Sequence, residues 1–317
     1  MSLQAEKLTF GVTEDKGPAI AAISSKLTAI AAALVFSRLF VRVKVQKRLF
    51  CDDFWTVLSM AGAALSHYFL TQAVDNGSGR HITEIDPSQL SSILRDTTFG
   101  FIGGILTLGL LKITIVSLLL RVLAPKRMLL TLTWSLGVVS GLSLLAMALM
   151  TLFQCSPIDA AWNFGIDAVC WPLSYVLITG YWSGAVSILA NFAYLAIPAI
   201  TLRRTQLSLL KEAGLGLALG VGLLPVTAGV IRTAKLGLLG GADPIFNFCD
   251  LLYWTSIEAN LTIMAVCVPA FQPLLERKKE RESGIFGEAQ HLPAGDEKHG
   301  RRALNLFNTV VDSERKA

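Results

Sequence analysis

The sequence predicts an all-α membrane protein, a bundle of seven transmembrane helices with its N-terminus outside the cytosol and its C-terminus in the cytosol. Only 16% of the 317 residues are charged, whereas an ordinary soluble domain carries about 25%. The apolar residues form runs of about 20, the length that crosses a hydrocarbon core of about 30 Å. Lysine and arginine are concentrated in alternate connections between these runs, which is the pattern that orients spans.

The seven expected spans are justified in order along the chain. The first is too long for the apolar part of a cleaved signal peptide, so we expect none. Asp52 and Asp53 stand just before the second, where they would cap its N-terminus and answer the nearby basic cluster. Gly100 and Gly104 in the third favour close helix contact, and the fifth is long enough to tilt. The spans cover residues 18–41, 54–75, 97–122, 129–152, 172–201, 213–237 and 251–273.

These spans divide the chain into three parts. They are an outer N-terminal segment, 1–17, a seven-helix transmembrane domain, 18–275, and a cytosolic, largely disordered basic tail, 276–317. Fourteen lysines and arginines lie in or after the connections on one side and four on the other, so the side with fourteen should face the cytosol. The net charge of +5 is spread in short clusters between apolar runs, which argues for anionic lipid and against nucleic acid as the partner.

The outer connection between spans four and five holds Cys155 and Cys170. Disulfides persist outside the cytosol, so we expect these two to pair, with Cys249 as the rival partner and two free thiols as the alternative. The outer loop before span three contains Asn76-Gly77-Ser78, which fits the acceptor motif for glycosylation, although it lies close to the membrane. No cysteine spacing resembles a metal site.

Short motifs in a shared order make the chain resemble the fungal rhodopsin-domain integral membrane proteins, of the satratoxin-cluster membrane protein type. The resemblance runs from about Arg38 to Pro273. One position departs from the pattern, because Asn191 stands where the family often carries an acid late in span five. The matching residues are Asp52, Asp53, Gly79, Arg80, His81, Lys112, Arg121, Cys155, Pro157, Trp162, Cys170, Arg232, Trp254, Glu258, Pro269 and Pro273.

The resemblance implies two kinds of role. Some relatives look like receptors for surface or chemical cues, and others are encoded beside secondary-metabolite enzymes and are thought to handle the metabolite. Retinal binding is not expected, because a retinal protein needs a lysine in its last span and residues 251–273 contain none.

Ionisable residues inside spans are costly and are functional candidates by default. At 1.5 Å per residue, four of them on four helices share one level, about 8 to 10 Å below the outer ends of their spans: Lys26, His67, Arg232 and Glu258. Tyr181, Trp182 and Asn260 come at about 14 Å, and Trp254 is a further wall residue. We expect one polar pocket open to the outside, with Arg80 and His81 as a lid formed by the outer loop.

Arg232 and Glu258 should form a buried ion pair, because an unpaired charge at that depth costs several kcal/mol. Glu258 is the candidate general acid or base, with Arg232 setting its charge state. Purely structural roles stay open as alternatives. The pair would only hold two spans together, and His67 would be a satisfied bundle histidine. The tryptophans would be interfacial anchors, and Lys112 would extend to the cytosolic interface.

These observations favour an integral membrane protein that handles a hydrophobic small molecule. It would be an enzyme or accessory factor of terpenoid or polyketide biosynthesis that uses acid/base chemistry without a cofactor, such as a cyclase or isomerase. Its partners would be the small molecule, the bilayer of an endomembrane or the plasma membrane, and pathway enzymes. The alternative is a G-protein-coupled-type receptor. Against it, the connection between spans three and four has only about five residues and that between spans five and six about eleven, which leaves little surface for a transducer.

Overall fold

The computed structural model describes residues 15–123, 127–163, 165–203, 209–241 and 243–271. The chain divides into two compact units, Met1–Ala270 and Phe271–Ala317, and the fold below is that of the first. The expected disordered tail, 276–317, and most of the outer segment, 1–17, lie outside the described residues.

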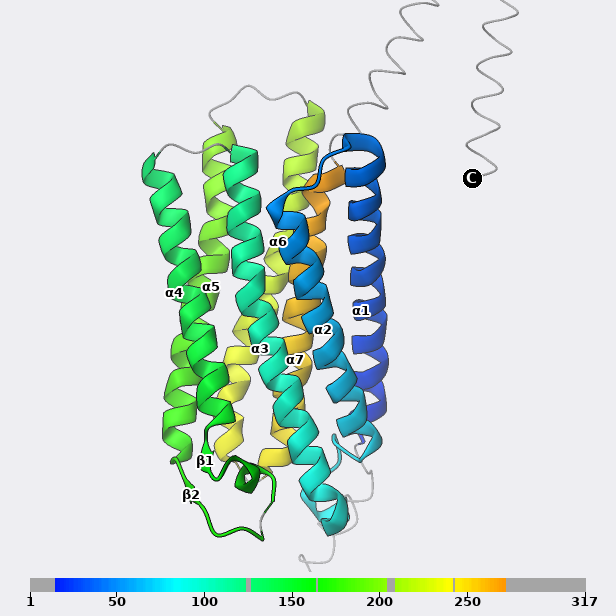
Figure 1. Ribbon diagram of the computed structural model, residues 1–317, viewed down its shortest axis with the longest axis vertical. Helices are drawn as coiled ribbons and strands as arrows, with labels where there is room; N and C mark the ends of the chain where they lie inside the picture. The colour runs from blue at the N-terminus through cyan, green and yellow to red at the C-terminus, as the bar shows by residue number, and fades with distance from the viewer. Residues whose placement is uncertain (1–14, 124–126, 164, 204–208, 242, 272–317) are drawn as a thin grey trace, which may run out of the picture. The chain divides into compact units, whose positions relative to one another are not determined.

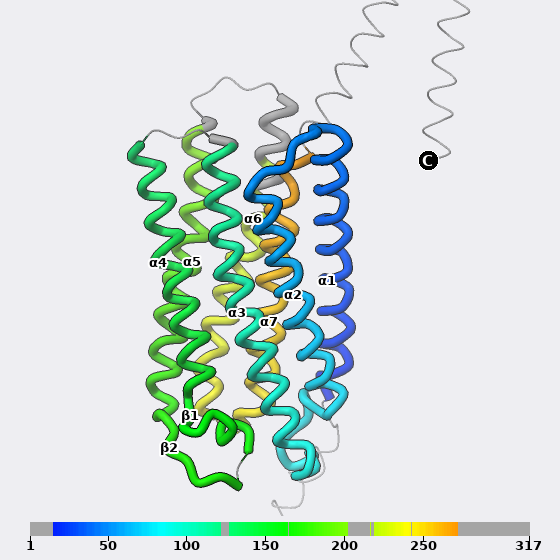
Figure 2. Tube along the Cα trace, in the orientation of Figure 1, coloured from blue at the N-terminus to red at the C-terminus, as the bar shows by residue number. Residues whose placement is uncertain are grey.

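Seven α-helices lie side by side in this unit, and Figure 1 shows their long axes running roughly parallel. The connections alternate between the two ends of the bundle, as the tube in Figure 2 shows. Each helix overlaps one of the seven expected spans: α1 Gly17–Phe40, α2 Cys51–Asp75, α3 Pro87–Leu123, α4 Arg127–Leu152, α5 Leu173–Arg203, α6 Leu209–Lys235 and α7 Pro244–Cys267.

Six helical segments within the described ranges are long and apolar enough to cross a bilayer, and each overlaps one of the helices α1 and α3 to α7. The remaining helix, α2, carries Asp52, Asp53 and His67 and is less apolar than the others. It nevertheless packs between α1 and α3 in the same bundle. The protein is therefore a multi-pass membrane protein.

Helices α3 and α7 begin well before the expected spans, ten residues before 97 and seven before 251. Both begin with an Asp-Pro pair. The Asp86 carboxylate accepts a hydrogen bond from the Ser88 N–H at 3.0 Å, and Asp243 accepts one from the Phe246 N–H at 3.2 Å. Proline at the first helical position and an acidic cap start a helix irrespective of hydropathy, so an apolar-run criterion places both starts too late.

The inner layer of the bundle is formed by α3 and α7. Their most apolar windows are 56% and 61% buried, whereas the windows of the other four spanning segments are 28% to 33% buried. Glycine lets these two helices approach each other, because a Cβ at Gly104 of α3 would lie 2.7 Å from Thr255 Cγ2 of α7. Side chains that point inward from α7 are consequently shielded on all sides.

A buried ionic cluster joins helices at the end that carries most of the arginines. Arg38 of α1 donates to both Asp52 and Asp53 at the start of α2 and to the Val266 carbonyl of α7, the last at 2.6 Å. Arg121 of α3 donates to Asp52 at 2.6 Å. Asp53 also accepts from the Phe50 N–H at 3.1 Å, so it caps α2 as expected.

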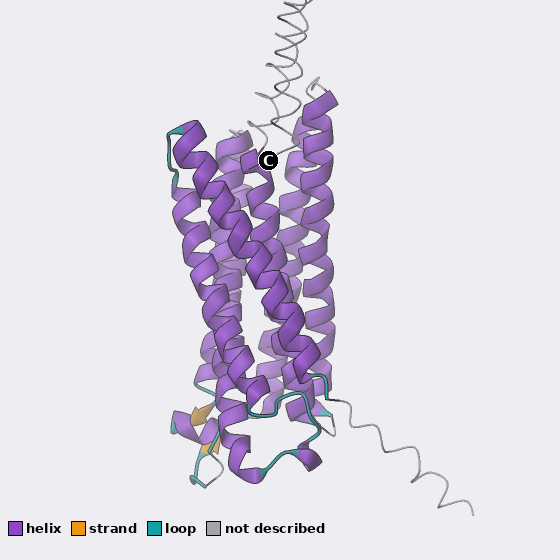
Figure 3. Cartoon of the chain, turned by 90° about the vertical axis from the view of Figure 1, so that its right-hand side faces the viewer, coloured by secondary structure: helices purple, strands orange, loops and turns teal. Residues whose placement is uncertain are grey.

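The opposite end carries the expected disulfide. Cys155 and Cys170 are bonded and lie in two short antiparallel strands, β1 Cys155–Ser156 and β2 Val169–Cys170. A short 3₁₀ turn, Ile158–Ala161, lies between them. Figure 3 shows both strands at one end of the bundle. The rival thiol, Cys249, is buried and free.

Candidate functional site

The expected ion pair between α6 and α7 is present and fully buried. Arg232 Nε lies 2.7 Å from Glu258 Oε2, and the two side chains are 1% and 0% exposed. The pair is only half satisfied, since Arg232 Nη2 and Glu258 Oε1 make no hydrogen bond to any described residue. Buried polar atoms are nearly always bonded, so these two atoms mark a place where the protein retains unused binding capacity.

Glycine provides the space for the carboxylate. Gly229 lies on α6 three residues before Arg232, on the same face of the helix. A Cβ at Gly229 would lie 3.0 Å from Glu258 Oε1, which is tighter than an ordinary contact. The unbonded oxygen therefore rests directly against the backbone of α6.

Lys112 of α3 is a third charge in the interior. It is 2% exposed, and its Nζ donates to Asn191 Oδ1 of α5 at 2.5 Å and to the Ser187 carbonyl at 3.4 Å. Lys112 thus turns inward to α5 rather than extending to the interface, and that alternative is wrong. Its ammonium interacts electrostatically with Glu258 and Arg232.

We call Lys112, Arg232 and Glu258 the core charge cluster. Two cations and one anion leave it with one surplus positive charge when all three are ionised. The departure from the family pattern explains the surplus, because Asn191 provides an oxygen to Lys112 without a negative charge.

A separate chain of polar groups lies between α1, α2 and α7. Ser24 Oγ is 3.1 Å from His67 Nδ1 and 2.9 Å from Ser256 Oγ. Asn260 donates from Nδ2 to Thr28 Oγ1 at 3.1 Å. His67 is therefore a satisfied, half-buried bundle histidine, and Asn260 is buried on the same side of α7.

The expectation of one shared chamber is not met, because α7 separates these two polar regions. Two residues along an α-helix differ by about 200° in direction. Glu258 consequently faces α6, whereas Asn260, two positions later, faces α1.

Four further residues assigned to the chamber do not converge on it. Lys26 is on the exposed face of α1, and Tyr181 and Trp182 of α5 are 42% and 62% exposed. Trp254 of α7 is half-buried and makes an edge contact with Tyr253. Depth along the helix axis does not determine which way a side chain points.

The outer loop ties elements together instead of covering a chamber. Arg80 Nε lies 3.0 Å from Asp15 Oδ2, and His81 Nδ1 lies 3.0 Å from Asp243 Oδ2 and stacks on Phe246 at 4.6 Å. Partial burial opposes the ionisation of Asp243, but hydrogen bonds from the Phe246 N–H, His81 and the Ile82 N–H lower the pKa of its carboxyl below the usual value.

The glycosylation motif is engaged in the fold. Asn76 Nδ2 donates to Asp96 Oδ2 at 3.2 Å, and Ser78 is 1% exposed. Glycosylation of Asn76 stays a prediction.

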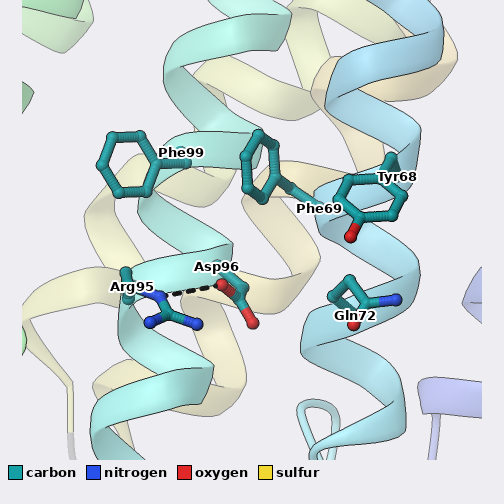
Figure 4. A pocket seen from close by; sticks show the side chains of 6 residues that line it. All are labelled: Tyr68, Phe69, Gln72, Arg95, Asp96 and Phe99. Carbon is teal, nitrogen blue, oxygen red and sulfur yellow. Dashed lines mark hydrogen bonds and ion pairs between the residues drawn. The ribbon is translucent and has the colours of Figure 1, made fainter.

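An open pocket, which we call the outer pocket, lies between α2 and α3 near the disulfide end and has a volume of about 240 Å³. It is lined by residues that the sequence reasoning did not select: Tyr68, Phe69, Gln72, Arg95, Asp96 and Phe99 (Figure 4). The adjacent Arg95 and Asp96 lie just before residue 97, where the apolar run begins. The Asp-Pro start of α3 is the signal that could have placed them on a helix.

The family model for the fungal rhodopsin domain matches residues 37–277. The chain is 26% identical over 153 residues to "Fugralins biosynthesis cluster protein 2" of Gibberella zeae, and this alignment covers 48% of this chain and 36% of that protein. It is 23% identical over 272 residues to "Polyenoic acids biosynthesis gene cluster protein Ba17b" of Metarhizium anisopliae, and this alignment covers 81% of this chain and 72% of that protein. A "SAT4 family membrane protein" of Emericella nidulans is 24% identical over 241 residues, and this alignment covers 75% of this chain and 59% of that protein. No solved structure matches significantly.

Proposed function

The chain belongs to the fungal rhodopsin domain family, and we propose that it acts on a hydrophobic small molecule in secondary-metabolite biosynthesis. Two relatives are named as proteins of biosynthesis clusters, although the alignments cover only 36% and 72% of their lengths. All seven helices would span the membrane, with the N-terminus outside and the arginine-rich end of the bundle in the cytosol. Pathway enzymes would be its partners at the membrane.

The half-satisfied ion pair carries this proposal. A pair that only holds two helices together would gain most by using all of its polar atoms, because a buried donor or acceptor without a partner costs about 1–3 kcal/mol. Glu258 instead commits one oxygen to Arg232 and leaves the other unbonded in the interior. Unused polar atoms on the central helix are what a ligand or proton-transfer site requires.

The chemistry that fits is proton transfer without a cofactor. Glu258 Oε1 would accept a proton from a carbon of the bound molecule and return it at another carbon, which isomerises a double bond and leaves no net change in atoms or electrons. Arg232 would hold the carboxylate ionised for the first step, and the cationic Lys112 would favour the electron-rich intermediate. Because Glu258 is 0% exposed, the molecule reaches it only when α6 separates from its neighbours.

The test is replacement of the gene by a Glu258→Gln version in the native host, followed by mass spectrometry of the metabolites. The matched control is Asp250→Asn, which weakens the Lys235–Asp250 pair between the same two helices at 2.7 Å. We expect Glu258→Gln to accumulate a precursor of the same mass as the lost product, and Asp250→Asn to leave the profile unchanged. An unaltered profile with normal amounts of the Glu258→Gln protein in the membrane would refute the acid/base role.

A receptor is the second candidate, and the ionic cluster at the arginine-rich end favours it. Arg38 connects α1, α2 and α7, and Arg121 adds α3. Such a cluster could hold one arrangement of four helices until a chemical cue selects another. Binding of the metabolite without turnover, with an affinity that guanine nucleotides change, would support the receptor over the enzyme.

A further inference from the structure

The outer pocket is a second place where a small molecule can bind, and it shares no residue with the core charge cluster. Its volume of about 240 Å³ is below the roughly 300–1,000 Å³ that encloses a whole drug-sized ligand. It therefore accommodates one end of a molecule. Tyr68 and Arg95 at its rim have side chains that are about half exposed, so the rest of the molecule can extend along the exposed face of the bundle.

The apolar walls are flat aromatic rings. Phe69 of α2 and Phe99 of α3 have centroids 5.7 Å apart and planes tilted by 31°. Tyr68 meets the edge of Phe69 at 5.5 Å, and Trp162 of the disulfide loop approaches Phe99 at 5.5 Å. Ring faces and edges bind a planar π-system more favourably than a saturated chain of equal area. The walls thus select a conjugated segment.

The polar side of the pocket is electrically balanced. Asp96 is 4% exposed and accepts from Arg95 Nε at 3.1 Å and from Asn76 Nδ2 at 3.2 Å. The charges of Arg95 and Asp96 cancel, so the pocket offers no net charge to an ion. An anion would gain from Arg95 and lose against the Asp96 carboxylate beside it.

Hydrogen-bond donors remain unused in this balanced site. The terminal nitrogens of Arg95 have no partner among the described residues, and Figure 4 shows them on the α3 side of the pocket, with Gln72 on the α2 side and the Tyr68 hydroxyl directed between the helices. Asp96, the main acceptor, is already occupied by two donors. The complementary ligand group is an uncharged acceptor, a carbonyl or ester oxygen.

We propose that the outer pocket binds the carbonyl or ester end of an uncharged, conjugated molecule that reaches it along the exposed face between α2 and α3. The conjugated segment lies against Phe69 and Phe99, and the oxygen accepts from Arg95. This site is independent of any chemistry at Glu258, so either assignment can fail without the other.

The test uses the full chain, purified in detergent micelles and captured on scintillant beads, with the tritiated methyl ester of octadeca-2,4,6,8-tetraenoic acid, in which four conjugated double bonds continue directly from the ester. The scintillation signal reports probe that is held at the captured protein, and an excess of unlabelled ester gives the background. We expect Phe99→Ala and Arg95→Leu each to weaken binding about fivefold to tenfold. The matched controls, Phe192→Ala on the exposed face of α5 and Arg80→Leu in the outer loop, should bind as the wild type does.

Two competitors test the ligand class. Methyl stearate has the same chain length and ester but no double bonds, and the ionised tetraenoic acid has the double bonds but a charge; both should displace the tritiated probe at least tenfold less well than the unlabelled tetraenoic ester does. Equal binding by Phe99→Ala and Phe192→Ala, or equal competition by either competitor, would overturn the proposal. Phe99→Leu, which keeps a large apolar side chain but removes the ring, guards against misfolding and should still weaken binding.

Discussion

Removing the arginine from the buried ion pair tests the energetics of the core directly. In Arg232→Met, Glu258 keeps its burial of 0% exposure and loses the guanidinium at 2.7 Å. Breaking one partner of such a pair costs about 3–5 kcal/mol, because a buried charge is left uncompensated. Lys112 shares the interior and offsets part of this cost, so we expect a value near the lower end, about 3 kcal/mol.

The comparison that isolates this effect is with a pair on the same two helices. Lys235–Asp250 has the same 2.7 Å separation, but its side chains are 34% and 17% exposed, so Lys235→Met should cost about 0–1 kcal/mol. The double variant Arg232→Met with Glu258→Met should regain most of the loss, because it removes both charges. The measurement is the free energy of unfolding in mixed detergent micelles.

The outcome that would refute this reasoning is equally specific. If Arg232→Met cost no more than Lys235→Met, the interior around Glu258 would have to be hydrated. The two pairs would then differ in exposure without differing in energy.

Three further predictions concern other parts of the bundle. Gly184→Ala should cost about 1–3 kcal/mol of stability, because the new Cβ would clash with the Thr233 side chain. Adding Thr233→Ala should restore the stability. If Gly184→Ala alone left the unfolding free energy unchanged, the close packing of these two helices would be contradicted. Asn191→Asp should stabilise the fold by about 1 kcal/mol by giving Lys112 a charged partner at the present 2.5 Å contact, which a lower unfolding free energy would disprove. Asp243 has a pKa below its ordinary 3.8, so its stabilisation is present above that pH and is lost as the pH falls through the lowered value. The difference in unfolding midpoint between wild type and Asp243→Asn should accordingly be full at about pH 6 and shrink below about pH 4, and a difference independent of pH would refute it.

Much of the fold could be predicted because hydropathy and charge report directly on the bilayer. All seven helices, the Cys155–Cys170 disulfide and the Arg232–Glu258 pair follow from span length, compartment and the cost of an unpaired charge. Hydropathy alone places the helix starts at Asp86-Pro87 and Asp243-Pro244 too late, because capping determines them.

The arrangement around the helix axes could not be predicted in the same way. Lys26 and Glu258 share a depth, yet one faces outward and the other is buried. Span limits uncertain by one residue rotate each predicted direction by about 100°. The outer pocket depends on how α2 and α3 are turned relative to each other, so its six residues became visible only in three dimensions.

Helix α7 lies between the two polar regions and separates them. The hydroxyl chain of Ser24 and Ser256 is on one side, and the Glu258 carboxylate is on the other. Among the described residues no hydrogen bond or ion pair joins the two sides, so thermodynamic coupling between His67 and Glu258 would have to be carried by α7 itself or by the electric field between the two groups. The size of that coupling in a double-mutant cycle therefore measures how strongly α7 transmits a change from one of its faces to the other.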